Sequence, residues 1–135
     1  MYRHTVQYYE TDKMGVTHHS NYIRWMEEAR VDFLEKKGWP FDRLEKEGII
    51  SPVISVNASY KKPSRFSDKV DIDVSVIEFS GVKLKIGYRM FLGGELICEG
   101  ESGHCFVDDK GIPLRLKKNF PDFYAMLEEE AKKNA

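Results

Sequence analysis

The stretch VDIDVSVIEFSGVKLKIGYRMFL, residues 70–92, alternates apolar and polar side chains with a period of two. This alternation is typical of β-strands that bury one of their two faces. Ser80-Gly81 inside the stretch and Gly93-Gly94 after it are typical of hairpin turns. Similar alternating runs cover residues 54–60 and 95–108. We therefore expect long, half-buried strands, and those joined by short turns should pair as antiparallel neighbours.

Residues 20–37 show a second pattern, with the period of an α-helix. Ser20 or Asn21 is expected to cap its first turn, and Gly38 followed by Pro40 is a typical stop signal. The helix should present a wide apolar surface, because apolar side chains recur every three or four positions, at Tyr22, Met26, Ala29 and Phe33.

Three further elements complete the predicted fold. We expect a first strand over residues 2–8, a short helix over 41–47 and a last helix over about residues 121–132. The sheet and the long helix each have an apolar face to bury, and a curved sheet wrapped around the helix buries both. The sequence thus predicts an α+β fold, with about five antiparallel strands around a central helix and residues 1–135 in one domain.

Composition argues against several classes of protein. The chain has 135 residues and a formal net charge of -1, whereas nucleic-acid-binding domains usually carry a strong basic excess. Residues 1–11 lack the apolar core of a signal peptide, and no apolar run approaches the ~20 residues that span a membrane. We therefore expect a cytoplasmic protein. Cys98 and Cys105 fit no metal or redox pattern and are expected to be free thiols.

The most unusual segment is YYETDKMGVTHHSNY, residues 8–22, between the first strand and the long helix. It places Asp12 seven residues before His19, at the expected start of the helix. Backbone N–H groups at a helix N-terminus are unpaired, and the helix dipole favours negative charge there. A reacting carbonyl at that position would have its developing oxyanion stabilised. The segment therefore predicts a catalytic loop.

A family resemblance rests on this segment. The run Tyr9-Glu10-Thr11-Asp12, then Gly15-Val16, His19, Asn21-Tyr22 and Arg24, resembles the signature of hotdog-fold thioesterases. The nearest group is the YbgC-like and 4-hydroxybenzoyl-CoA thioesterase-like acyl-CoA thioesterases. Residues 60–63, Tyr-Lys-Lys-Pro, are similar to the end of that family's second strand. The resemblance implies a hotdog fold and an enzyme that hydrolyses an acyl-CoA thioester to a carboxylic acid and CoA, without a cofactor.

The resemblance also implies roles for individual residues. Asp12 matches the family's catalytic aspartate, as a general base for water or a direct nucleophile, and the backbone amide of His19 matches its oxyanion-hole donor. Active sites of this family form between subunits, so a homodimer or homotetramer is implied. An acyl-carrier protein could replace CoA. The implied substrate-binding residues are Gly15, Val16, His18 and Tyr22, with Lys61, Lys62 and Arg65 for the CoA phosphates.

Other interpretations remain open. A hotdog hydratase or dehydratase acts on similar thioesters, although its DxNPxH pattern is absent, and a non-catalytic acyl-thioester binding module would also use a polar loop. Asp12, His18 and His19 could in principle bind a metal, but no second histidine pair with familiar spacing supports this, so we expect no metal. Tyr22, Trp25 and Met26 are more typical of the core than of an acyl pocket, although the resemblance favours substrate contact for Tyr22.

Overall fold

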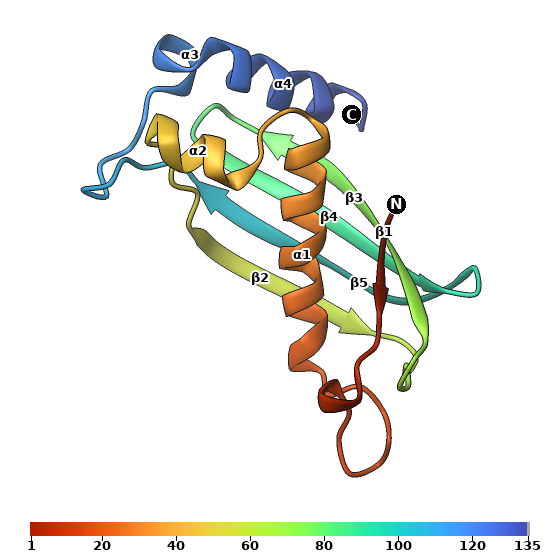
Figure 1. The fold of residues 1–135 in the computed structure, drawn as a ribbon. Helices are drawn as coiled ribbons and strands as arrows, with labels where there is room; N and C mark the ends of the chain where they lie inside the picture. Colours follow the sequence, from red (N-terminus) through yellow and green to blue (C-terminus); the bar gives the residue numbers. More distant parts are fainter. Residues whose placement is uncertain (135) are drawn as a thin grey trace.

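The computed structural model describes residues 1–134 and contains a five-stranded antiparallel sheet with helices (Figure 1). The strand order is β1-β3-β4-β5-β2, so that β1 and β2 form the two edges. A short 3-10 helix covers Tyr8–Glu10. The strands are β1 (Tyr2–Thr5), β2 (Val53–Tyr60), β3 (Lys69–Phe79), β4 (Lys83–Leu92) and β5 (Glu95–Cys105), and the helices are α1 (Ser20–Lys36), α2 (Phe41–Glu47), α3 (Leu116–Asn119) and α4 (Pro121–Lys132).

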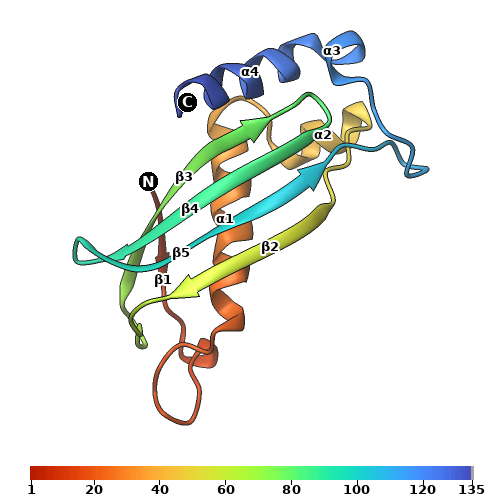
Figure 2. The same cartoon turned by 180° about the vertical axis from the view of Figure 1, so that it is seen from behind.

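The helix α1 lies across one face of the sheet, and the view from behind shows the opposite face without a covering helix (Figure 2). The loop between β1 and α1 lies at one end of the molecule, while α2, α3 and α4 lie toward the other end. This arrangement confirms the predicted α+β fold, in which a curved sheet and a long helix bury each other's apolar faces.

The core forms where α1 meets the sheet. Trp25 and Ala29 of α1 and Ile72 and Met90 of the sheet are fully buried. Burying one such large apolar side chain contributes roughly 1.5–3 kcal/mol to stability. Gly100 in β5 leaves room for both β2 and α1, because a Cβ there would overlap the backbone carbonyl oxygen of Asn57 and the end of the Met26 side chain.

Most of the predicted elements are confirmed. The long helix ends one residue earlier than expected, and the helices at 41–47 and 121–132 have the predicted bounds. The strands β3, β4 and β5 are consecutive antiparallel neighbours. Cys98 and Cys105 are free thiols, as predicted. No helix within residues 1–134 is long and apolar enough to cross a membrane.

Three strand predictions differ from the structure. The first strand ends at Thr5, because the chain turns into the 3-10 helix, and Tyr8 is exposed. The last strand ends at Cys105, ahead of a turn that the Asp108 side chain stabilises by accepting from two backbone amides. The third difference is β2, which we expected to be half-buried. It is an edge strand whose apolar side chains are largely exposed, with Val56 at 42% and Tyr60 at 45%.

Candidate functional site

The β1–α1 loop holds Asp12 at an exposed tip. The carboxylate Oδ1 accepts from the backbone amide of Met14 at 2.8 Å, and the amide of Asp12 donates to the carbonyl of Val16 at 2.9 Å. Gly15 adopts a φ of 77°, a left-handed conformation that glycine accommodates readily, and its amide donates to the carbonyl of Asp12. The loop is therefore a closed turn that presents the second carboxylate oxygen outward.

The helix α1 begins directly after His19, as the expected oxyanion site requires. Within residues 1–134, the backbone amide of His19 donates to no acceptor. The expected capping by Ser20 or Asn21 is wrong: neither side chain caps the helix. The Ser20 hydroxyl instead pairs with His18 Nδ1 at 2.8 Å, and the side-chain amide of Asn21 donates through Nδ2 to the backbone carbonyl of Glu10 at 3.0 Å. The His19 amide is consequently left available to a ligand.

Buried hydroxyl groups fasten the returning half of the loop to the rest of the fold. Thr17 donates its amide to the Ser64 carbonyl at 2.8 Å, and the two hydroxyls lie 2.6 Å apart. Tyr22 is buried, with its hydroxyl 2.9 Å from the same Ser64 Oγ, as expected for a core residue. The end of β2 lies close by, since the Tyr60 ring is centred 6.0 Å from the His19 ring.

The predicted phosphate-binding residues lie beside this loop. Val16 forms an isolated bridge with Arg65, whose guanidinium approaches Gly15. The two lysines form exposed ion pairs with β5, Lys61 with Glu99 at 3.4 Å and Lys62 with Glu95 at 2.9 Å. Exposed pairs of this kind stabilise a fold little, so that a phosphate could compete for either lysine.

An apolar cavity of about 640 Å³ lies elsewhere, between α1, α2 and the start of β2. Its polar lining residues are Glu27, Arg30, Glu45, Ser51 and Asp109. Arg30 is nearly buried and donates to Glu27 at 2.7 Å, while its Nε has no partner within residues 1–134. No sequence pattern predicted the cavity, although an arginine on the apolar side of a predicted helix was a usable signal. Apolar walls come from Phe41, Leu44, Ile49, Ile50, Pro52 and Val53.

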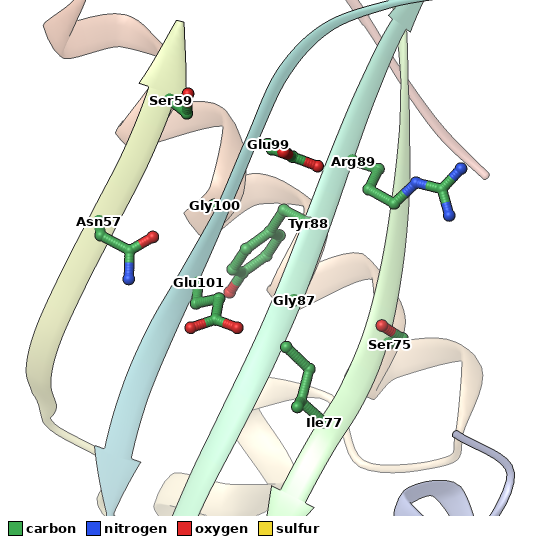
Figure 3. A pocket seen from close by; sticks show the side chains of 10 residues that line it. All are labelled: Asn57, Ser59, Ser75, Ile77, Gly87, Tyr88, Arg89, Glu99, Gly100 and Glu101. Atoms are coloured by element: carbon green, nitrogen blue, oxygen red, sulfur yellow. The ribbon is translucent and has the colours of Figure 1, made fainter. Parts of the chain in front are cut away.

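A shallower hollow of about 430 Å³ lies on the sheet face that no helix covers (Figure 3). Charged groups such as Arg89, Glu99 and Glu101 project from the strands around it. None of the residues predicted for the catalytic loop line it. Within residues 1–134, no group of three or more His, Cys, Asp or Glu side chains is arranged to hold a metal ion.

Within one chain, the catalytic loop and the apolar cavity are far apart. His19 and Arg30 are eleven positions apart on one helix, which corresponds to about 16 Å along its axis. The edge strand β2 links the two regions, because Val53 at its start lines the cavity and Tyr60 at its end lies beside His19. The structure therefore brings together Asp12, Gly15, Val16, the histidines and Arg65, but leaves the cavity separate.

Comparison with known proteins identifies the class of protein to which the chain belongs. The Thioesterase-like superfamily matches residues 6–127, so the chain belongs to that superfamily, and the predicted thioester-hydrolase class is confirmed.

Individual relatives agree with this class. YneP of Bacillus subtilis (strain 168), provisionally named an acyl-CoA thioesterase, is 35% identical over 129 residues and 94% of both chains. The acyl-CoA thioester hydrolase YbgC of Escherichia coli O157:H7 is 27% identical, over 83% of this chain and 81% of its own. A solved DHNA-CoA thioesterase from Staphylococcus aureus superposes with a TM-score of 0.93 at 36% identity, covering 98% of this chain and 91% of its own. The predicted hotdog fold is confirmed.

Proposed function

We propose that this chain is an acyl-CoA thioesterase that releases a free carboxylic acid and CoA, with Asp12 and the His19 amide at the reacting carbonyl. The observation that carries the proposal is the loop itself, in which an exposed carboxylate precedes a helix whose N-cap amide, that of His19, has no acceptor within residues 1–134. The names of YneP and YbgC support CoA as the thiol carrier.

The chemistry needs few groups, because a thioester has a good leaving group: a comparable free thiol has a pKa of about 8.5. Asp12 would either deprotonate a water or attack the carbonyl carbon, and its free oxygen is available for both. As the carbonyl oxygen gains charge, the His19 amide would donate to it, at the positive end of the α1 dipole. Lys61, Lys62 and Arg65 would hold the CoA phosphates beside the loop.

A homodimer would complete this site. The exposed edge of β2 presents unpaired backbone groups and the apolar Val56, features of a strand that pairs with another chain. Two copies of β2 related by a two-fold axis would pair antiparallel, and Tyr60 of one copy would then lie beside Val53 of the other. The apolar cavity of each subunit would thus adjoin the catalytic loop of its partner. We infer that the acyl group enters the partner's cavity.

The test is Asp12→Asn, assayed for thiol release from a panel of acyl-CoA substrates. Asparagine can keep the bond to Met14 but supplies neither a base nor a nucleophile, so kcat should fall about 10²- to 10⁴-fold. Asp108→Asn is the matched control, because Asp108 makes the same contact with the amide two residues later, at 2.8 Å. Wild-type turnover by Asp12→Asn would contradict the proposal, and hydration of crotonyl-CoA without thiol release would favour a hydratase.

A further inference from the structure

The carboxylate of Glu10, two residues before Asp12, is buried and meets three donors. Its Oε1 accepts from the backbone amide of Gln7 at 2.8 Å and lies 2.8 Å from His4 Nε2, and its Oε2 accepts from Trp25 Nε1 at 2.8 Å. An ionised carboxylate only accepts, so it satisfies all three. Burial acts to raise the pKa of Glu10, but these hydrogen bonds outweigh it and lower the pKa below its ordinary value.

The backbone carbonyl of Glu10 holds the other end of the same loop. It accepts from the amide of His18 at 2.8 Å and from the side chain of Asn21 at 3.0 Å. Asp12 comes two residues after Glu10 in the sequence. His19 directly follows His18, whose amide donates to the Glu10 carbonyl. Glu10 therefore fixes the two ends of the segment that carries the carboxylate and the oxyanion amide.

His4 on β1 connects Glu10 to the long helix. Its Nε2 faces Glu10, and its Nδ1 lies 3.0 Å from Glu28 Oε1, which also accepts from the Tyr2 hydroxyl at 2.7 Å. A neutral imidazole has one N–H and can satisfy only one of these carboxylates, whereas an imidazolium donates to both. The ring also packs on Trp25, with the centroids 4.5 Å apart.

The other groups around the ring are uncharged. The paired position on β3 is Val70, which is uncharged. Burial and the nearby Glu28 raise the pKa of Tyr2 to about 12, so this residue remains a neutral donor over the working range. Glu10 from the loop and Glu28 from α1 are the charged groups that contact His4 within residues 1–134.

We propose that Glu10, held by Gln7, His4 and Trp25, is a positioning residue, which sets Asp12 relative to the His19 amide without touching the substrate. This inference rests on the proposed function of that loop. It makes the geometry of the site depend on one carboxylate that β1, the loop and α1 hold together.

Glu10→Gln tests the proposal. Whichever way the new amide is turned, its N–H₂ group faces a donor, either Trp25 or the pair formed by Gln7 and His4. We expect kcat to fall roughly 10- to 100-fold with KM nearly unchanged, because displacement of about 1 Å has effects of that size. Glu28→Gln is the matched control: its amide oxygen can still accept from Tyr2 and His4, and kcat should stay within about twofold of wild type at neutral pH.

The split between kcat and KM distinguishes positioning from simple substrate binding. A Glu10→Gln enzyme with wild-type kcat, or one in which KM rises while kcat does not fall, would overturn the proposal.

A spectroscopic measurement separates this inference from the proposed function. In folded Asp12→Asn protein, the amide resonances of residues 12–19 should shift together when Glu10→Gln is added and should stay in place when Glu28→Gln is added. Unchanged resonances in the Glu10→Gln protein would overturn the positioning role, whereas a fully active Asp12→Asn enzyme would overturn the proposed chemistry instead.

Discussion

The two ends of α1 differ in almost every physical respect. At its start, the loop around Asp12 is polar, closed by hydrogen bonds and exposed. Toward its other end lies a largely apolar cavity of about 640 Å³ whose lining includes the buried Arg30. One chain thus separates the candidate catalytic groups from this apolar cavity. The edge strand β2 runs between the loop and the cavity. Pairing of β2 in two copies would place the loop of one subunit beside the cavity of the other.

Two histidines, His4 and the fully buried His104, show the same contrast. His4, near the loop, contacts carboxylates through both nitrogens. His104, toward the cavity, lies in a chain of hydroxyl groups: its Nε2 is 2.7 Å from Ser102 Oγ, which is 2.7 Å from the Tyr88 hydroxyl. Burial, with the positive charge of Arg30 as the next cause, lowers the pKa of His104 to about 4. The fold therefore surrounds one histidine with negative charge and keeps the other neutral.

The largest expected effect comes from breaking the β2 edge. Val56→Lys places a charge near the middle of β2, where a two-fold axis would bring two such charges together. Subunit pairing should be lost, and activity should fall roughly 100-fold or more, because each loop then lacks its partner's cavity. Val82→Lys alters a comparably exposed valine away from β2 and should remain dimeric and active. Sedimentation velocity with parallel assays measures both, and a fully active Val56→Lys monomer would contradict the dimer.

A smaller and selective effect is expected from filling the cavity. Ile50→Trp adds bulk at a half-exposed wall of the cavity, so longer acyl chains should be excluded while the shortest are still hydrolysed. For each methylene that no longer fits, kcat/KM should fall about fourfold, the equivalent of ~0.8 kcal/mol. Ile112→Trp, at an exposed position outside the cavity, is the control. An unchanged chain-length profile in Ile50→Trp would place the acyl group elsewhere.

The smallest effect concerns stability alone. Because the folded-state pKa of His104 is about 4, below the ordinary 6.5, the unfolded chain binds its proton at higher pH than the folded chain does. The contribution of His104 to stability is therefore fully present above pH 6.5 and is lost as the pH falls toward 4, by about 3 kcal/mol. Urea unfolding across this range should show that loss in wild type and a smaller loss in His104→Gln. Equal losses in the two proteins would contradict a neutral, buried His104.

The fold was largely predictable because the periodicity of residues 70–92 and 20–37 reflects burial against each other within one chain. The exposure of β2 was not predictable, since Val56 and Tyr60 lie in a run with the alternation of a half-buried strand. The strand order is what shows β2 at an edge of the sheet, where these side chains stay exposed. An alternating pattern indicates that a strand has an apolar face. It does not indicate whether that face is covered by the same chain or by a partner chain.

The site was predictable only in part. The loop motif singled out Asp12 and His19 as candidates, because a carboxylate and a helix start lie seven residues apart in sequence, and the structure places both in the β1–α1 loop. The His4–Glu10–Trp25 contacts were not predictable, since these residues come from three different elements and no local pattern marks them. Arg30 and the cavity also depend on tertiary packing, although an arginine within an apolar helical stripe was a visible signal.

The most direct test of a shared site is complementation between two inactive variants. Asp12→Asn lacks the catalytic group, and Ile50→Trp lacks the space for a long acyl chain, so each homodimer should be inactive on a long-chain acyl-CoA. In a mixed dimer, one of the two sites combines an intact Asp12 from one subunit with an open cavity from the other. Mixing equal amounts and allowing subunits to exchange should restore roughly a quarter of wild-type activity. If no activity returned although mixed dimers had formed, each subunit would have to bind and cleave the substrate alone.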